Sequence, residues 1–199
     1  DFTGAGKLLA AWAYVQTEGK PNVLIIGSSD VLPSIPFVQS IQDQLKALCP
    51  DCKQTHLDVP VSEWATKIQS GTQSALLADP SINYILPIYD SMSQFVVPAL
   101  RITGSEGAVR IASFNGTPFV LDMVREGQVE MDIGESLGWA GYAAIDNIMR
   151  MLCEKPEVAK LNVPLLVFDK SNIETAGVPA NFDDGYGDAH LEGFRKLWM

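Results

Sequence analysis

Polar residues follow directly after several short apolar runs of this sequence. The four turns are GSSD at 27–30, IYDS at 88–91, SFNGTP at 113–118 and DIGES at 132–136. They supply hydroxyls, carboxylates and an amide, which are groups that exchange hydrogen bonds with polar molecules. If the apolar runs are parallel strands, these turns meet at the carboxyl edge of the sheet, where open α/β sheets bind ligands.

The same turns carry no pattern of nucleophilic or nucleotide chemistry. The sequence has no G-x-S-x-G elbow, and His56 and His190 both lie outside the four turns. The segment GSSDVLPS lacks the later glycines of a dinucleotide fingerprint and the lysine of a Walker A loop. We therefore expect a protein that is not an enzyme, with no catalytic residue, no cofactor and no metal. A small flavodoxin-like enzyme is an alternative that these residues do not support.

The spacing of apolar residues predicts an alternation of strands and helices. Short apolar runs predict strands at 22–27, 54–59, 83–89, 109–116, 129–134 and 163–170. Apolar residues three and four apart predict helices at 4–16, 38–48, 64–75, 93–103, 118–127, 136–153 and 191–199. Such alternation predicts an α/β fold: a doubly wound, mainly parallel sheet in a Rossmann-like α/β/α arrangement of three layers.

Composition limits the classes of partner. The 199 residues carry 24 acidic and 14 basic side chains, a net charge of −10. This balance repels phosphate backbones and anionic membrane surfaces, so we expect no nucleic-acid partner. No apolar run approaches the ~18 residues of a membrane span. The chain starts without Met or a signal peptide, which leads us to expect a removed leader or a piece of something longer.

Three cysteines are too few for a disulfide framework. Cys49 and Cys52, in the segment CPDC, could form a local disulfide, remain inert thiols, act as a redox motif or supply half of a metal site. A zinc site would need further ligands from Cys153, His56 and His190.

Three residues near the predicted edge have two interpretations each. Asp90 could cap the helix that follows it, and Asn115 with Gly116 could form a simple turn. Both side chains could instead point into a ligand-binding crevice. Trp64 could begin the core face of a helix, or it could be a stacking platform for a flat apolar ligand face.

The segments DFTGAGKLLAAW, NVLIIGSSD, NYILPIYDSMSQ, VRIASFNGTP and VPLLVFDK occur along nearly the whole chain. In this order and spacing the sequence resembles the ribose-type (type I) family of bacterial periplasmic sugar-binding proteins, the receptors of ABC importers. The resemblance implies a periplasmic or extracellular receptor, lipid-anchored in some cases, with a sugar-like small-molecule ligand and a membrane permease as partners. The alternative is the effector-binding domain of a lactose-repressor-like transcription regulator, which shares this fold.

The resemblance also implies two lobes with a ligand between them, of which this chain matches the carboxyl-terminal one. Residues 1–135 would form the ligand-binding lobe, 136–160 a helix that returns to the missing lobe, and 161–199 the last strand and a tail helix. The apolar stripe of the Trp139 helix would then be underburied and could drive self-association. We expect the chain alone to bind ligand weakly or undetectably.

Carried over by position, the resemblance implies a set of ligand contacts. Asp90 and Asn115 match sites that hydrogen-bond sugar hydroxyls, Trp64 falls near an aromatic that stacks on the ring, and Glu135 lies near a hinge-proximal amide. Ser29, in the turn after the first strand, is a further candidate.

Two positions depart from the ribose-type pattern. Phe37 stands where those receptors place an arginine, and Tyr89 where they place an asparagine. Two rings in place of two polar groups should weaken recognition of a small, bare pentose, because unpaired hydroxyls are costly to bury. We expect a larger or less polar ligand, such as a decorated sugar, a polyol or an aromatic compound.

Overall fold

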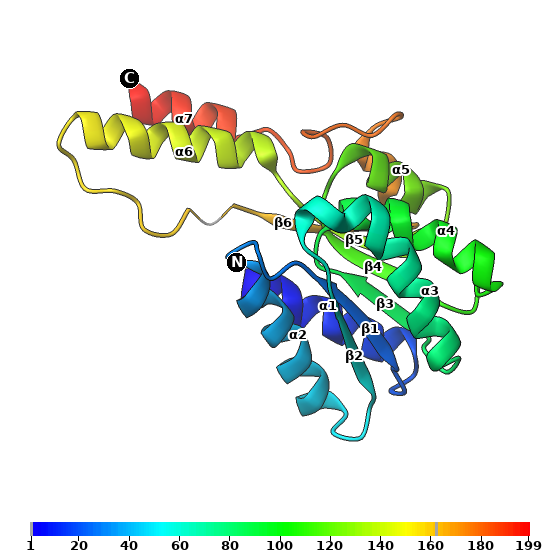
Figure 1. Ribbon diagram of the computed structural model, residues 1–199. Coiled ribbons are helices and arrows are strands. Elements are labelled where there is room, and N and C mark those ends of the chain that lie inside the picture. Colours follow the sequence, from blue (N-terminus) through cyan, green and yellow to red (C-terminus); the bar gives the residue numbers. More distant parts are fainter. Residues whose placement is uncertain (1, 162) are drawn as a thin grey trace.

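The computed structural model describes residues 2–161 and 163–199, and its centre is a six-stranded sheet (Figure 1). The strands are β1 (Val23–Gly27), β2 (Gln54–Asp58), β3 (Tyr84–Pro87), β4 (Arg110–Asn115), β5 (Met131–Glu135) and β6 (Leu165–Asp169). Their order is β2-β1-β3-β4-β5-β6, with the first five parallel and β6 antiparallel to β5. The predicted doubly wound, mainly parallel sheet is confirmed.

Helices cover both faces of the sheet. Their bounds are α1 (Phe2–Gln16), α2 (Ser34–Leu48), α3 (Gln69–Ala78), α4 (Ser93–Thr103), α5 (Pro118–Arg125), α6 (Leu137–Leu152) and α7 (Ala189–Trp198). α1 and α2 pack together on one face, while α3, α4 and α5 lie on the other (Figure 1). The helix predicted to start at Trp64 begins instead as a 3-10 turn and a π-helical turn (Trp64–Ile68) that lead into α3.

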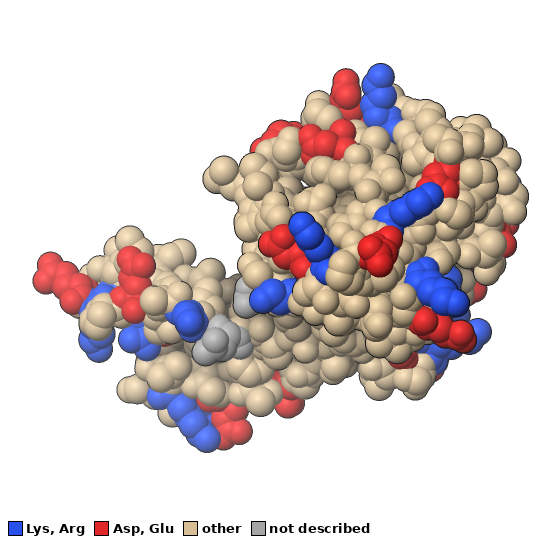
Figure 2. All heavy atoms as spheres, turned by 90° about the horizontal axis from the view of Figure 1, so that it is seen from below, with Lys and Arg blue, Asp and Glu red and all other residues tan. Residues whose placement is uncertain are grey.

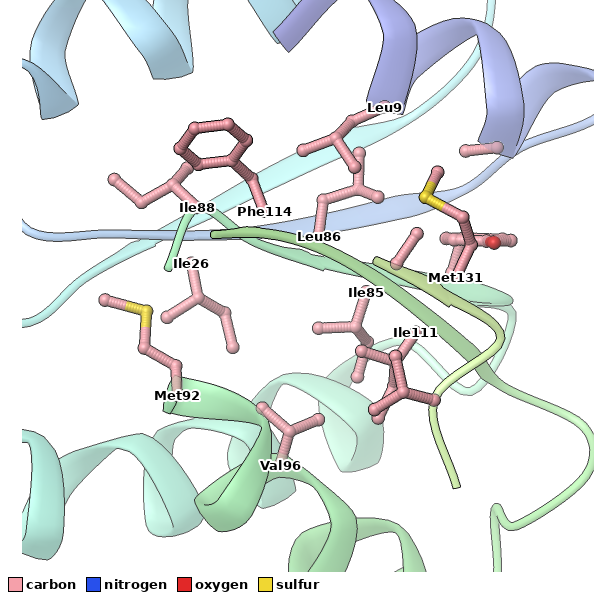
Figure 3. Packing of buried hydrophobic residues seen from close by; sticks show 14 of the residues in the cluster. Leu9, Ile26, Ile85, Leu86, Ile88, Met92, Val96, Ile111, Phe114 and Met131 are labelled. Carbon is pink, nitrogen blue, oxygen red and sulfur yellow. The ribbon is translucent and has the colours of Figure 1, made fainter. Parts of the chain in front are cut away.

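The core fills both sides of the sheet with apolar side chains. All five residues of β1 and all four of β3 are buried, as expected for strands covered on both faces. Figure 3 shows Leu9 of α1 and Phe114 on one side of the sheet, and Ile26 and Val96 on the other. Burial of this kind is the main favourable contribution to folding, about 25 cal/mol per Å² of apolar surface.

The two neighbouring cysteines form a local disulfide. Cys49 and Cys52 are bonded across the turn between α2 and β2, with their Cα atoms 5.3 Å apart. Of the alternatives that the sequence left open for this pair, the structure has the disulfide. Cys153 is free and exposed. The described residues contain no group of His, Cys, Asp and Glu side chains that could hold a metal ion.

α6 and α7 form an arm that leaves the sheet. Figure 1 shows α6 running away from the end of β5, with α7 along it, and Figure 2 shows the arm projecting from the main body. Tyr142 of α6 stacks on Phe194 and Trp198 of α7 at 5.7 Å between ring centroids. Between these two helices the chain returns to the sheet as β6. The range 161–199, taken as one unit from the sequence, therefore contributes β6 to the sheet and α7 to the arm.

One face of α6 remains exposed beside α7. Ile145, Ile148 and Leu152 are 50%, 56% and 80% exposed. Trp139 and Tyr142 of the same helix pack against α7, so the expected underburied stripe is exposed only in part. Self-association through it stays a prediction. In residues 2–161 and 163–199, none of the helices has both the length and the apolarity needed to cross a membrane. Asp1 and Asn162, which fall within the predicted lobe and tail ranges, lie outside the described residues.

Phe37 belongs to the core. Its side chain is fully buried, and its ring lies 5.4 Å from that of Phe114 and 6.0 Å from that of Phe2. The resemblance implied a ligand contact at this position, whereas the ring packs against α1 and Phe114 in this structure.

Replacing Phe37 therefore tests its structural role. Phe37→Ala should lower the free energy of unfolding by about 3–5 kcal/mol, because it leaves a cavity in a packed aromatic cluster. Phe119→Ala is the matched control, since Phe119 is 42% exposed on α5, and it should cost under about 1 kcal/mol. Urea unfolding of both variants measures the difference. Equal losses would show that Phe37 is not a core residue.

Candidate ligand-binding site

The turns after β3 and β4 are tied together through Thr117. Asp90 accepts hydrogen bonds from the Thr117 backbone N–H (2.6 Å) and hydroxyl (2.8 Å). The Thr117 hydroxyl in turn accepts from the Asn115 side-chain amide (3.3 Å). Asp90 and Asn115 thus share one edge of the sheet, as predicted. Asp90 is fully buried, however, so it lies beneath the rim while the half-buried Asn115 lies on it.

A second carboxylate holds the same turn from the other side. Asp132 of β5 is fully buried and accepts hydrogen bonds from the Gly116 N–H (2.8 Å) and the Ser113 hydroxyl (2.7 Å). The backbone donors of Gly116 and Thr117 are therefore both held by carboxylates. Gly116 has φ +78°, and a β-carbon there would lie 2.9 Å from the Cα of Gly134, so the turn requires glycine.

The two buried carboxylates interact electrostatically and form no ion pair with a basic residue in the described part of the chain. None of the ion pairs in the described part of the chain includes Asp90 or Asp132. Burial raises the pKa of Asp90 to about 6, although its hydrogen bonds to Thr117 oppose the shift. Burial, and then the charge of Asp90, raises the pKa of Asp132 well above its usual value. The pair therefore titrates as a unit above the normal range of carboxylic acids.

Two half-buried rings lie along the same edge. The Trp64 indole donates to the Ser28 hydroxyl (2.7 Å) and to the Val59 carbonyl (3.2 Å). Its ring lies 5.9 Å from that of Tyr89, tilted by 33°. The Tyr89 hydroxyl lies 3.4 Å from that of Ser34, at the start of α2. These contacts fix an aromatic wall, and stacking on a ligand by either ring stays a prediction.

Ser29 lies in a different part of the edge. Its N–H and hydroxyl both donate to the Asp58 carboxylate, at 2.8 and 2.6 Å. It lines a cavity of about 180 Å³ beside α2, together with Ser28, Ser34 and His56. Because Asp58 already occupies its polar atoms, Ser29 contributes to the shape of this cavity more readily than to a ligand hydrogen bond.

Glu135 ends β5 one residue beyond the position opposite Asn115. In the β4–β5 register Asn115 pairs with Gly134, so Glu135 follows at the same rim. Its side chain is half-buried and is thus available to a bound molecule. The structure brings Asn115, Glu135 and the Tyr89–Trp64 wall to one edge. It places Asp90 and Phe37 behind that edge.

The sequence analysis included Thr117 and Asp132 only as members of the turns at 113–118 and 132–136, and it missed Tyr186. Asp132 had one signal, a carboxylate inside an otherwise apolar strand, which usually marks a buried hydrogen-bonded group. Tyr186 comes from the Gly- and Asp-rich tail after β6, yet it packs against the core beside Phe168. Nothing in the tail pattern predicts this position.

The turns that follow β1 to β5 carry acidic residues and no Lys or Arg. The segments 28–33, 58–64, 88–92, 115–117 and 135–136 contain no Lys or Arg. Their acidic residues are Asp30, Asp58, Glu63, Asp90 and Glu135. Basic residues Lys53 and Arg110 stand at the opposite, amino ends of β2 and β4. The rim therefore favours a neutral or positively charged ligand over an anion.

The chain has a mainly parallel sheet with helices on both faces and polar side chains at its carboxyl edge. Residues 1–156 match the family described as periplasmic binding protein domain. The chain belongs to this family of binding proteins. A search of curated proteins finds no match.

Solved structures of sugar-binding proteins share the fold. An ABC transporter periplasmic solute binding protein from Actinobacillus succinogenes with bound D-allose has a TM-score of 0.78 at 22% identity, covering 87% of this chain and 62% of that chain. The Caulobacter myo-inositol binding protein has a TM-score of 0.76 at 19% identity, covering 87% and 60%. A solute binding protein from Agrobacterium vitis with bound allitol has a TM-score of 0.75 at 23% identity, covering 87% and 62%.

The chain thus spans about three fifths of the length of these structures, at 60–62% coverage. Neither the family nor these structures supports the alternative of a transcription regulator.

The raised pKa of Asp90 predicts a particular pH dependence of stability. A carboxyl group whose pKa is higher in the folded state than in the unfolded state stabilises the fold below about pH 4. That contribution is lost as pH rises through the folded value of about 6. Relative to Asp90→Asn, the free energy of unfolding of the wild type should fall by up to about 3 kcal/mol between about pH 4 and about pH 7.

Urea unfolding at several pH values checks this. Asp43→Asn, on the exposed face of α2, controls for removal of one negative charge and should follow the wild type. Parallel pH profiles of wild type and Asp90→Asn would contradict the account of the buried pair.

Proposed function

We propose that this chain is the ligand-binding lobe of a solute-binding protein that delivers a neutral sugar or polyol to the permease of an ABC importer. The observation that carries the proposal is the rim formed by Asn115 and Glu135 beside the Tyr89–Trp64 wall, on a lobe of this family. The site binds and does not catalyse.

The chemistry of this rim suits a polyhydroxylated molecule. A sugar hydroxyl donates and accepts at once, so it can donate to the Glu135 carboxylate and accept from the Asn115 amide. The C–H face of a ring or polyol chain packs well on an aromatic side chain. Asn115 is already fixed through Thr117 and the Gly116 backbone, which lowers the ordering cost of binding.

The charge of the edge narrows the ligand class. With no Lys or Arg in its turns and Glu135 at its rim, the site would force a carboxylate or phosphate of the ligand against like charge. Like charges brought together in a desolvated site cost several kcal/mol. The ligand is therefore not a sugar acid or a sugar phosphate, and an uncharged sugar or polyol matches the hydroxyl-binding groups of the rim. The three structures compared above also have uncharged sugars or polyols in their titles.

A second lobe would complete the site. The compared chains are longer than this one, and we propose that a further lobe closes over the carboxyl edge, excluding water and strengthening each hydrogen bond. On this basis the lobe alone binds ligand weakly. A periplasmic or cell-surface location fits the Cys49–Cys52 disulfide, since disulfides persist in oxidising compartments.

A thermal-shift and calorimetry screen of the complete gene product tests the proposal. Neutral probes are D-allose, myo-inositol and allitol, and anionic probes are glucuronate and glucose 6-phosphate. At least one neutral probe should raise Tm by mass action, and the anions should bind at least about tenfold more weakly. Tighter binding of the anions than of the neutral probes would contradict the proposed ligand class. Failure of all five probes to bind would contradict it as well.

Substitution at the rim locates the site. Asn115→Ala should weaken binding of the neutral probe by about tenfold or more, because a ligand hydroxyl loses its buried partner. Gln73→Ala removes an amide on α3 and should leave affinity unchanged. If both variants bind as the wild type does, the ligand site lies elsewhere.

A further inference from the structure

Tyr186 holds an unusual place between the tail and the ligand rim. It lies in the segment between β6 and α7, and its ring meets that of Phe168 edge-on, 5.4 Å between centroids at 83°. Its hydroxyl is buried and has no hydrogen-bond partner among the described residues. Burial of an unpaired hydroxyl costs free energy of folding, so the presence of this hydroxyl needs an explanation.

The hydroxyl fills the space between two turns of the carboxyl edge. A β-carbon on Gly134 would lie 2.0 Å from the Tyr186 oxygen, and one on Gly116 would lie 2.6 Å from it. Only glycine at both positions lets the hydroxyl enter. The tail, the turn after β4 and the end of β5 therefore meet at one atom.

The two glycines are the immediate neighbours of the two rim residues. Gly116 follows Asn115 and Gly134 precedes Glu135, so a shift of either backbone turns one of these side chains. The charges of Asp132, Asp90 and Glu135 act on the Tyr186 hydroxyl, and burial together with these charges raises its pKa. The hydroxyl therefore remains protonated, and it occupies the space between the Gly116 turn and Gly134.

We propose that Tyr186 is a positioning residue of the ligand site, which holds the Gly116 turn and Gly134 at the spacing that directs Asn115 and Glu135 toward one ligand. The inference rests on the proposed function and extends it to a residue of the tail. The tail is thus part of the site. Its Gly185, with φ +91° and a β-carbon position 2.9 Å from the Phe168 ring, allows the chain to bring Tyr186 into place.

Tyr186→Phe in the complete gene product is the principal test, because it keeps the ring and removes only the hydroxyl. Tyr14→Phe in α1 is the matched control. The first readout is the set of N–H residual dipolar couplings of Gly116, Thr117 and Glu135 in ligand-free protein. We expect these couplings to change in Tyr186→Phe and to stay as in the wild type in Tyr14→Phe.

The second readout separates positioning from stability. Tyr186→Phe should weaken binding of the neutral probe found above by about tenfold, while Tm of the ligand-free protein stays the same or rises, because an unpaired buried hydroxyl is removed. A merely structural tyrosine would lower Tm and leave affinity unchanged.

Unchanged couplings at all three amides overturn the inference, whether or not a ligand is known. Unchanged affinity in Tyr186→Phe overturns it as well. If no neutral probe binds the wild type, the proposed function fails, and the couplings alone still decide the role of Tyr186.

Discussion

The turn formed by Asn115, Gly116 and Thr117 is held by two buried carboxylates, and the candidate site depends on this constraint. Asp90 takes both donors of Thr117, and Asp132 takes the backbone donor of Gly116. Two acidic groups without a cation are costly to bury, as their raised pKa values show. In return the side-chain amide of Asn115 is fixed before any ligand binds. Binding therefore costs little additional conformational entropy at this residue.

The parallel sheet makes this arrangement possible. Because β1, β3, β4 and β5 run the same way, their carboxyl ends deliver side chains distant in sequence to one edge. The apolar core beneath, shown in Figure 3, keeps that edge rigid. The arm of α6 and α7 leaves from the same edge, directly after Glu135. Ligand rim and arm are therefore neighbours along the chain.

Sequence periodicity predicted the strands, their mainly parallel arrangement and the shared edge of Asp90 and Asn115, because these follow from local patterns and general rules of α/β folds. It could not predict burial within the edge. Asp90 meets Thr117 27 positions away, and Asp132 meets Gly116 16 positions away. The resemblance implied a ligand contact for Phe37, and only its packing against Phe2 and Phe114 shows that the ring is buried. The placement of Tyr186 and of α7 likewise depends on contacts that no local pattern records.

Amide hydrogen exchange of the ligand-free protein tests most directly whether the turn is preset. We expect the N–H groups of Gly116 and Thr117 to exchange as slowly as those of the neighbouring strand β4, because both are bonded to buried carboxylates. The exposed turn at Gly107 provides the solvent-exposed reference. Exchange of Gly116 and Thr117 as fast as that of Gly107 would contradict the account.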